Sequence, residues 1–237
     1  MGFQEMTGPI MESCFYNCDA LYMPQDHPAR GIHDLYFLKE KADLKKDQKY
    51  LNNGRKVHEE GWKYKFDENK SKELLLRSHG TALSARTLAK AEIPGKYFAL
   101  AKCYRPDVVD STHLTEFYQL EGIVLDKNVN FRHLLGLLAD FAKRIANADK
   151  IKFVPVAYFP FTEPSVTGYV WHKELKQWIE VLPAGIFRPE VTEPFGIKVP
   201  VLAWGIGLDR LFMIREGITD IRHLFSYNLH WLREAKI

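Results

Sequence analysis

The sequence predicts an α+β fold in which a mostly antiparallel β-sheet is flanked by helices. Strand-like stretches follow one another along the chain, with helices interspersed rather than strictly alternating, and this order favours antiparallel pairing. One segment, residues 131–146, carries apolar side chains at helical spacing. With 237 residues, 46% of them hydrophobic, the chain can build one continuous core. We therefore treat residues 1–237 as a single domain.

The first part of the chain combines short extended segments with charged surface. Residues 2–38 are rich in aromatic side chains and interrupted by prolines, which favours extended segments and turns over a long helix. Residues 39–61 are crowded with charge and contain Asn-Asn-Gly at 52–54, so we expect an exposed, partly helical excursion without chemistry. A helix is predicted over 81–91, where the Pro-Gly pair at 94–95 ends it.

The rest of the chain supplies most of the predicted sheet. Residues 97–105 and 116–126 have the composition of strands and are joined by a polar loop, which predicts a hairpin with a long connection. The helix over 131–146 follows, and residues 208–215 are predicted to form a helix behind the last strand. Further strands are predicted at 151–158, 166–172, 177–182 and 199–204.

Charge and hydropathy exclude several classes of protein. A net charge of +3, from 33 Lys and Arg against 30 Asp and Glu, gives no strong footprint for nucleic acid, so a general nucleic-acid-binding protein is disfavoured. No apolar run approaches the roughly 20 residues needed to cross a bilayer. The start of the chain lacks the basic and apolar regions of a signal peptide. We expect a cytoplasmic protein that does not enter membranes.

The chain has three cysteines, Cys14, Cys18 and Cys103. They form no CxxC pair and no even framework, so neither a zinc site nor a disulfide scaffold is predicted. We expect reduced, structural thiols, because free cysteine usually behaves as a small buried hydrophobe.

The second strand of the predicted hairpin places an aromatic ring, an amide and a carboxylate on one surface. Side chains two residues apart share a face of a strand, which brings Phe117, Gln119 and Glu121 together. In a dry core the two polar groups would be costly without partners. On the floor of a site they can bind an ammonium group, and the ring can stack on a flat ligand. Spacing alone leaves both interpretations open, since an edge strand can simply expose such residues.

The residues around this hairpin resemble a known family. Arg-Pro-Asp at 105–107, followed by DSTH at 110–113 and EFYQLEG at 116–122, closely resembles the motif 2 region of phenylalanyl-tRNA synthetase alpha subunits, which are class II aminoacyl-tRNA synthetases. The sequence of these motifs is nearer the archaeal and eukaryotic cytosolic branch of the family than the bacterial one. Four further blocks resemble family segments in the family's order, namely residues 2–9 (the strand half of motif 1), 27–30, 158–165 (the aromatic pocket segment) and 204–210 (motif 3).

The resemblance implies the class II catalytic fold and a ligase that uses ATP and Mg²⁺. Such an enzyme activates L-phenylalanine to phenylalanyl-adenylate and transfers it to tRNA(Phe), and the family works as two alpha and two beta subunits. The implied catalytic residues are Arg105, on the α-phosphate and the substrate carboxylate, and Arg210, on the γ-phosphate. Without the resemblance, each arginine would be interpreted as a surface or ion-paired residue.

The resemblance also implies which residues hold ATP. Phe117 would stack on adenine and Asp107 would accept from its amino group, with Gly205 and Gly207 also at the nucleotide. Glu180, which precedes a turn expected at 184–185, is the predicted Mg²⁺ ligand. Its alternative role is that of an ordinary strand carboxylate.

A further set is implied for phenylalanine. Gln119 and Glu121 would hold the α-amino group, while His79 and Thr81 close the polar end. Phe159 and Phe161, expected on one strand face, would meet the substrate ring edge to face. Ala203 would lie at the far end of the ring, beside Gly205. Alternatively, His79 is a hydrogen-bonded core histidine, and an aromatic pair at that spacing is more often core than pocket.

The sequence departs from the family pattern at several positions. Gly80 stands where the family usually has Thr, Pro183 where it usually has Gly, and Thr167-Gly168 where a more polar or acidic pair is common. The family's N-terminal tRNA-binding region and the helix of motif 1 are expected to lie outside this chain. These departures keep open an alternative, in which the chain is a catalytically weakened synthetase-like paralogue or fragment that binds an amino acid or a partner protein.

Overall fold

The computed structural model describes residues 2–157 and 159–235. Its main sheet has seven strands in the order β1 (Gln4–Glu5), β5 (Gly95–Tyr104), β6 (Glu116–Leu125), β10 (Val201–Gly207), β9 (Gln177–Phe187), β8 (Thr162–His172) and β7 (Ile151–Val156). Every neighbouring pair is antiparallel except β1 and β5, which are parallel. The predicted α+β fold with a mostly antiparallel sheet is confirmed. The last residue of the strand predicted at 151–158 lies outside the described residues.

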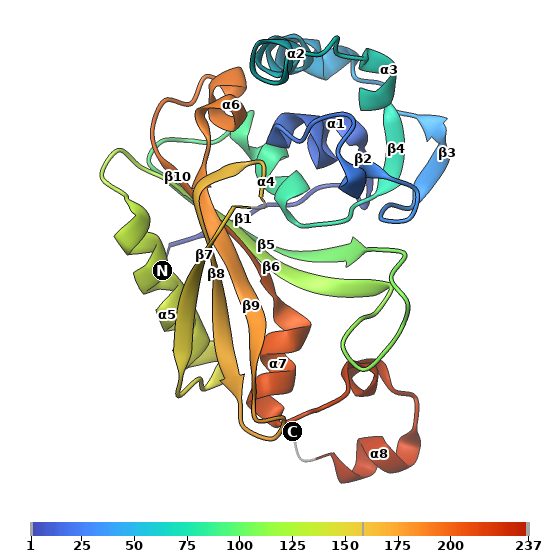
Figure 1. The fold of residues 1–237 in the computed structure, drawn as a ribbon, viewed down its shortest axis with the longest axis vertical. Coiled ribbons are helices and arrows are strands. Elements are labelled where there is room, and N and C mark those ends of the chain that lie inside the picture. The colour runs from blue at the N-terminus through green and yellow to red at the C-terminus, as the bar shows by residue number, and fades with distance from the viewer. Residues whose placement is uncertain (1, 158, 236–237) are drawn as a thin grey trace.

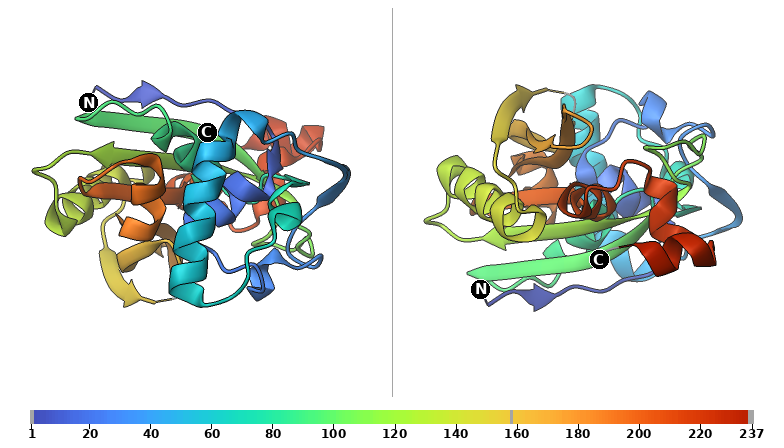
Figure 2. Two further views of the ribbon diagram at one scale, coloured as in Figure 1. Left: turned by 90° about the horizontal axis from the view of Figure 1, so that it is seen from above. Right: turned by 90° about the horizontal axis from the view of Figure 1, so that it is seen from below.

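One face of the main sheet is covered by α5 (Phe131–Ala146) and α7 (Leu208–Glu216), as Figures 1 and 2 show. The α5 helix has the predicted bounds because the residues that begin and end it act locally. Asn130 caps the first turn through its side chain, and a left-handed Asn147 ends the last turn. The buried stripe that packs on the sheet recurs at helical spacing and consists of Leu134, Leu138, Ala142 and Ala146.

The opposite face packs against α4 (Thr81–Leu88) and α1 (Cys14–Asn17), which share a core with β5 and β6. A small antiparallel sheet of β2 (Met11–Ser13), β4 (Glu73–Leu76) and β3 (Phe37–Lys41) lies beside these helices. The remaining helices are short apart from α2 and comprise η1 (Asp19–Leu21), η2 (Pro28–Arg30), η3 (Lys45–Asp47), α2 (Gln48–Trp62), α3 (Glu68–Ser71), α6 (Pro189–Thr192), η4 (Glu193–Phe195), η5 (Ile221–Phe225) and α8 (Leu229–Glu234).

The segment expected as an exposed excursion is only partly exposed. The helix α2 occupies most of it and buries Leu51, Gly54 and His58 along one stripe. The Asn-Asn-Gly sequence therefore lies inside a helix and not in a turn. A Cβ atom at Gly54 would lie 3.5 Å from the ring of Phe15, an ordinary van der Waals contact, so packing does not require glycine there. Because polar and charged residues separate these three buried positions, the sequence pattern did not indicate a buried face.

The turn expected at 184–185 is also absent. Ala184 and Gly185 lie inside β9, where Gly185 pairs with both Ser165 on β8 and Ala203 on β10. A Cβ atom at Gly185 would lie 2.5 Å from the Cβ atom of Thr162, so the strand needs glycine for close approach rather than for a turn.

Candidate active site

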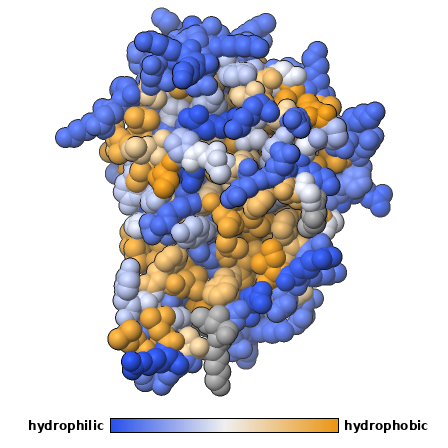
Figure 3. Space-filling view, turned by 180° about the vertical axis from the view of Figure 1, so that it is seen from behind, coloured by the Kyte–Doolittle hydropathy of each residue, from blue (hydrophilic) through white to orange (hydrophobic). Residues whose placement is uncertain are grey.

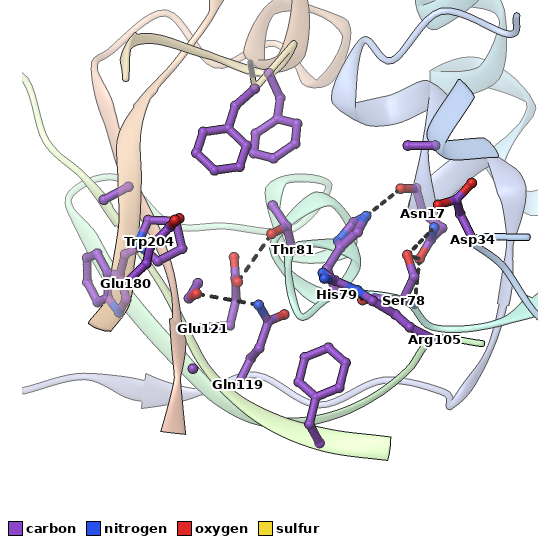
Figure 4. A pocket seen from close by; sticks show the side chains of 18 of the residues that line it. Asn17, Asp34, Ser78, His79, Thr81, Arg105, Gln119, Glu121, Glu180 and Trp204 are labelled. Carbon is purple, nitrogen blue, oxygen red and sulfur yellow. Dashed lines mark hydrogen bonds between the residues drawn. The ribbon is translucent and has the colours of Figure 1, made fainter. Parts of the chain in front are cut away.

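A pocket of about 710 Å³ opens on the face of the main sheet opposite α5 and α7. Its floor comes from β6 and β10, one wall from α1, α4 and the segment between β4 and α4, and the other from β9. Figure 4 shows Gln119 and Glu121 rising from the floor, with His79 and Arg105 on one side and Glu180 on the other. Residues predicted from distant parts of the sequence therefore meet in one cavity.

The floor confirms that Phe117, Gln119 and Glu121 share a face, because all three line the pocket. The neighbouring strand keeps this floor open, since Gly205 on β10 pairs with Glu121 and Gly207 pairs with Gln119. The Gln119 side chain is fixed at both ends of its amide: Nε2 donates to the Gly205 carbonyl at 3.4 Å, and Oε1 accepts from the Gly80 amide at 2.8 Å.

The carboxylate of Glu121 is fully buried and is held by hydroxyl groups. Ser84 donates to Oε1 at 2.7 Å and Thr81 donates to Oε2 at 3.2 Å. Burial outweighs both hydrogen bonds and raises the pKa of Glu121 to about 8. Neither hydroxyl carries the positive charge that would stabilise the ionised form, so this carboxylate is suited to a cationic ligand such as an ammonium group.

The wall beside the floor is a chain of hydrogen bonds that ends at an arginine. His79 Nε2 donates to the Asn17 carbonyl at 2.9 Å, and Asn17 Nδ2 donates to Ser78 Oγ at 3.0 Å. The Ser78 carbonyl then accepts from Arg105 Nε at 3.0 Å. Burial and the nearby Arg105 charge lower the pKa of His79 to about 4, so the ring is neutral at pH 7.

His79 is both hydrogen-bonded and part of the pocket. Because Nε2 donates to a carbonyl, the neutral ring carries a lone pair on Nδ1. That atom is buried and has no hydrogen-bond partner among the described residues. A hydrogen-bond donor on a bound ligand can therefore donate to His79 Nδ1.

The two arginines are presented differently. The Arg105 guanidinium lies over one face of the Phe117 ring, with its carbon 5.0 Å from the ring centroid, and burial lowers its pKa. Arg210, in the first turn of α7, reaches the Thr112 carbonyl at 3.4 Å and remains only half-buried. Both line the pocket together with Asp107. The predicted phosphate-binding and adenine-binding residues are thus brought together at one end.

The aromatic wall corrects one expectation. Phe159 and Phe161 lie in the connection between β7 and β8 and not on a strand, because β7 ends at Val156 and β8 begins at Thr162. The rings nevertheless line the same pocket, with centroids 5.6 Å apart, and Phe161 meets Phe187 edge-on at 6.4 Å. Ala203 lines the pocket from β10, so this region is apolar as predicted.

Glu180 lines the pocket from β9, and its Oε1 accepts from the Thr167 hydroxyl at 2.9 Å. Among the described residues, no three His, Cys, Asp or Glu side chains cluster in a way that would hold a metal ion. Mg²⁺ is commonly bound through one or two carboxylates plus substrate phosphates rather than by a protein cage. A single carboxylate at the wall of a pocket of about 710 Å³ fits that mode of binding.

The departures from the family pattern at Gly80 and at Thr167-Gly168 have local explanations, whereas nothing in the structure explains Pro183. Thr167 supplies the hydroxyl that holds Glu180. A Cβ atom at Gly168 would lie 2.8 Å from that of Leu182, and one at Gly80 would lie 2.9 Å from that of Glu121. Side chains at either glycine would therefore require their neighbours to shift.

Several residues of the site were not predicted. Asn17 and Ser78 are 61 positions apart in the chain, and no local pattern links them. Asp209 accepts from the Tyr118 amide at 2.6 Å and so ties α7 to β6; its place next to Arg210 in the motif 3 block was an available signal. Ser84 follows Thr81 by one helical turn, which is also visible in the sequence.

Comparison with known proteins gives the same assignment across the chain. Residues 1–235 match the family model of the class II tRNA synthetase core domain (F). The chain is 52% identical over 246 positions to the phenylalanine–tRNA ligase alpha subunit of Thermococcus gammatolerans, covering 100% of this chain and 49% of the relative. The corresponding subunit of Pyrococcus abyssi is 53% identical with the same coverage, and that of Treponema pallidum is 49% identical, covering 98% of this chain and 43% of the relative.

The chain spans about half the length of these curated relatives. Within that span, the match to the family model runs over almost the entire chain, from residue 1 to residue 235. The chain therefore belongs to the class II tRNA synthetase core domain family and is similar throughout to phenylalanine–tRNA ligase alpha subunits.

Proposed function

We propose that this chain activates L-phenylalanine with ATP, forming phenylalanyl-adenylate and pyrophosphate, and that the activated amino acid passes to tRNA(Phe). The observation that carries the proposal is the convergence in one pocket of a buried carboxylate, an aromatic wall and two arginines. These groups match the ammonium, the ring and the phosphates of the two substrates.

The amino-acid end is defined by charge and shape. The α-ammonium of phenylalanine would pair with Glu121 and donate to the free lone pair of His79 Nδ1. Its ring would meet Phe159 and Phe161 edge to face, with Ala203 at the far end. Gln119, whose amide is held at both ends, would complete the polar end without moving.

The chemical step requires positioning more than proton transfer. The substrate carboxylate attacks the α-phosphorus of ATP, and pyrophosphate leaves. No proton has to be removed from a carboxylate nucleophile, so catalysis can rest on alignment and charge stabilisation. The Arg105 guanidinium, fixed through Nε, leaves its outer nitrogens for phosphate and carboxylate oxygens, while the less buried Arg210 suits the γ-phosphate.

The remaining ATP contacts come from the same end of the pocket. Adenine would stack on the face of Phe117 that Arg105 does not cover, with Asp107 accepting from its amino group. Mg²⁺ bound between the phosphates would offset their charge. Glu180 is the side chain that would hold it, and Thr167 orients that carboxylate.

A strip of one lysine and three aromatic rings supports transfer to RNA. The strip consists of Lys152, Tyr169, Trp171 and Trp178 and continues from Glu180 along the pocket face of β7, β8 and β9. The ammonium of Lys152 lies 5.1 Å from the Tyr169 ring and 4.6 Å from the Trp178 ring. Lysine charge beside half-exposed rings is a surface on which single-stranded nucleotides stack, so we infer that it takes the single-stranded 3′ end of the tRNA.

An additional protein partner is also proposed. The relatives are named alpha subunits, and the family resemblance implies a beta subunit. Seen from behind, the molecule carries a broad hydrophobic area (Figure 3), on the side where β1 and β5 lie in Figure 2. Exposed apolar areas of this kind usually mark a binding surface.

Within the described residues, no helix is both long and apolar enough to cross a lipid bilayer.

Phenylalanine-dependent exchange of pyrophosphate into ATP tests the proposal, with the chain alone and with its partner subunit. We expect exchange in the wild type and its loss in Arg105→Ala. Arg144→Ala is the matched control, because that side chain is 76% exposed, pairs with Asp140 and lies on α5, which covers the face of the sheet opposite the pocket. Phenylalanine binding without any exchange would instead identify a synthetase-like binding module, and neither binding nor exchange would refute both.

A further inference from the structure

Two buried thiols border the pocket at α1. Cys14 is the first residue of this helix and Cys18 follows its last residue, with the Cys18 amide donating to the Cys14 carbonyl at 2.9 Å. The two side chains are therefore one helical turn apart, a spacing that places Cβ atoms about 5–6 Å from each other. Both thiols are free and buried, and Cys18 lines the pocket.

Both sulfur atoms face hydrogen-bond donors. Arg30 Nη2 lies 3.3 Å from Cys14 Sγ, and Asn17 Nδ2 lies 3.4 Å from Cys18 Sγ. The guanidinium is fixed by the Asp19 carboxylate at 2.8 Å and is itself almost fully buried. The Cys14 thiol, the Arg30 charge and the Asn17 amide together lower the pKa of Cys18 in spite of burial, whereas the pKa of Cys14 is raised. Cys18 is therefore the better nucleophile.

The third cysteine provides an internal contrast. Cys103 has no thiol beside it, and burial raises its pKa to about 12. Arg77 and Arg105 lower the pKa of Cys103, but burial outweighs them, and no second thiol is there to resolve an oxidised sulfur.

We propose that Cys14 and Cys18 form a reversible disulfide in response to hydrogen peroxide, which reaches Cys18 through the pocket. The Cys18 thiolate attacks one peroxide oxygen, the O–O bond breaks, and the hydroxide released takes up the proton that Cys18 gave off, forming water. The Cys14 sulfur then attacks the sulfenic sulfur of Cys18 and expels its hydroxyl group with the Cys14 proton as a second water. Two thiols are oxidised and one peroxide is reduced.

This disulfide would disturb the wall of the pocket. A disulfide needs Cβ atoms about 3.5–4.5 Å apart, so α1 must tighten by roughly 1–2 Å. Asn17, between the two cysteines, holds Ser78 through both ends of its side-chain amide, and its carbonyl holds His79. Ser78 in turn positions Arg105. Oxidation therefore weakens activation; this second half of the inference rests on the proposed function, while formation of the disulfide does not.

The disulfide is tested by treating the reduced protein with hydrogen peroxide, blocking remaining thiols with N-ethylmaleimide and analysing peptides by mass spectrometry. We expect the peptide that spans residues 14–18 to lose two hydrogen masses and stay unlabelled, and dithiothreitol to restore labelling. Cys14→Ser and Cys18→Ser should each abolish the bridged peptide, while Cys103→Ser should keep it. Full labelling of both cysteines after peroxide treatment, or a bridge in either serine variant, would overturn the proposal.

The effect on the site has two readouts. Amide hydrogen exchange of residues 77–81 should accelerate on oxidation, whether or not the protein is active. Pyrophosphate exchange should fall on the order of a hundredfold, recover with dithiothreitol, and resist peroxide in Cys14→Ser. A bridged protein with unchanged amide exchange and an unchanged rate would refute the coupling. Inactivity already in the reduced state would count against the proposed function alone, since labelling and amide exchange still decide the inference.

Discussion

Glu121 on β6 lies directly opposite Gly205 on β10, and the hydrogen side chain of that glycine keeps the carboxylate open to the pocket. A Cβ atom at this position would lie 3.1 Å from Glu121 Oε2 and 3.6 Å from Gln119 Nε2. The strand pairing of the sheet and the access of a ligand to the buried charge therefore depend on the same backbone position.

The Gly205→Ala substitution tests this relationship. The added methyl group crowds the two side chains assigned to the α-amino group, so we expect KM for phenylalanine to rise about tenfold, equivalent to one hydrogen bond to a charged group. Gly136→Ala is the matched control, because nothing lies within 4 Å of a Cβ atom there. Steady-state exchange kinetics distinguish them, and an unchanged KM in Gly205→Ala would contradict the assignment of Glu121.

Stability should depend on pH through Glu121. Its carboxyl group has a pKa of about 8 in the folded protein against an ordinary value of 4.5, so between these values the folded state binds more protons than the unfolded state. Stability due to this group is thus fully present below about pH 4.5 and is lost as the pH rises towards 8. We expect Glu121→Gln to flatten that decline in denaturant titrations at several pH values. Glu174→Gln, at an exposed position, should reproduce the wild-type decline of stability with pH. An equal decline in all three proteins would refute the role assigned to Glu121.

Ala203 is expected to limit the length of the amino-acid substrate. It is buried, lines the pocket and pairs with Gly185 and Ile123 on its two neighbouring strands. Ala203→Gly should admit para-substituted phenylalanines, at a stability cost of about 0.5–1 kcal/mol. Pyrophosphate exchange with para-chlorophenylalanine measures the change, and discrimination equal to that of the wild type would argue against this placement.

The strip on β7–β9 should matter for transfer and not for activation. Lys152→Ala is expected to lower kcat/KM for tRNA. It should also reduce the slope of log(kcat/KM) against log[salt] by about 0.7 in magnitude, the value for one lost phosphate contact with a single strand. Pyrophosphate exchange should remain unchanged. Lys96→Ala, an exposed lysine on β5, is the control. Equal losses in exchange and in tRNA charging would place Lys152 in the activation step instead.

The parts of this molecule that the sequence predicted are those governed by local rules. The face shared by Phe117, Gln119 and Glu121 follows from the two-residue period of a strand. The bounds of α5 follow from a capping residue and a regular stripe. Segment 39–61 was misjudged because its buried side chains are few and separated by charged ones.

Long-range geometry was not accessible in the same way. The link from Asn17 through Ser78 to Arg105 joins three segments whose neighbours give no hint of contact. The rings of Phe159 and Phe161 meet in a loop, although their spacing suggested a strand. In both cases, the tertiary arrangement and not the local pattern decides where the side chains lie.

The position of β10 has a consequence for biosynthesis. This strand inserts between β6 and β9, in the middle of the sheet, although β6 precedes it by about 75 residues and β5 and β6 are already paired with each other. Until residues 201–207 leave the ribosome, no strand joins the β1–β5–β6 group to the β7–β8–β9 group, so β6 and β9 each have an unpaired edge. Such edges invite aggregation. Assembly of the pocket is therefore delayed until residue 207 has been translated, and a chain that ends before β10 lacks the strand that joins the two parts of the site.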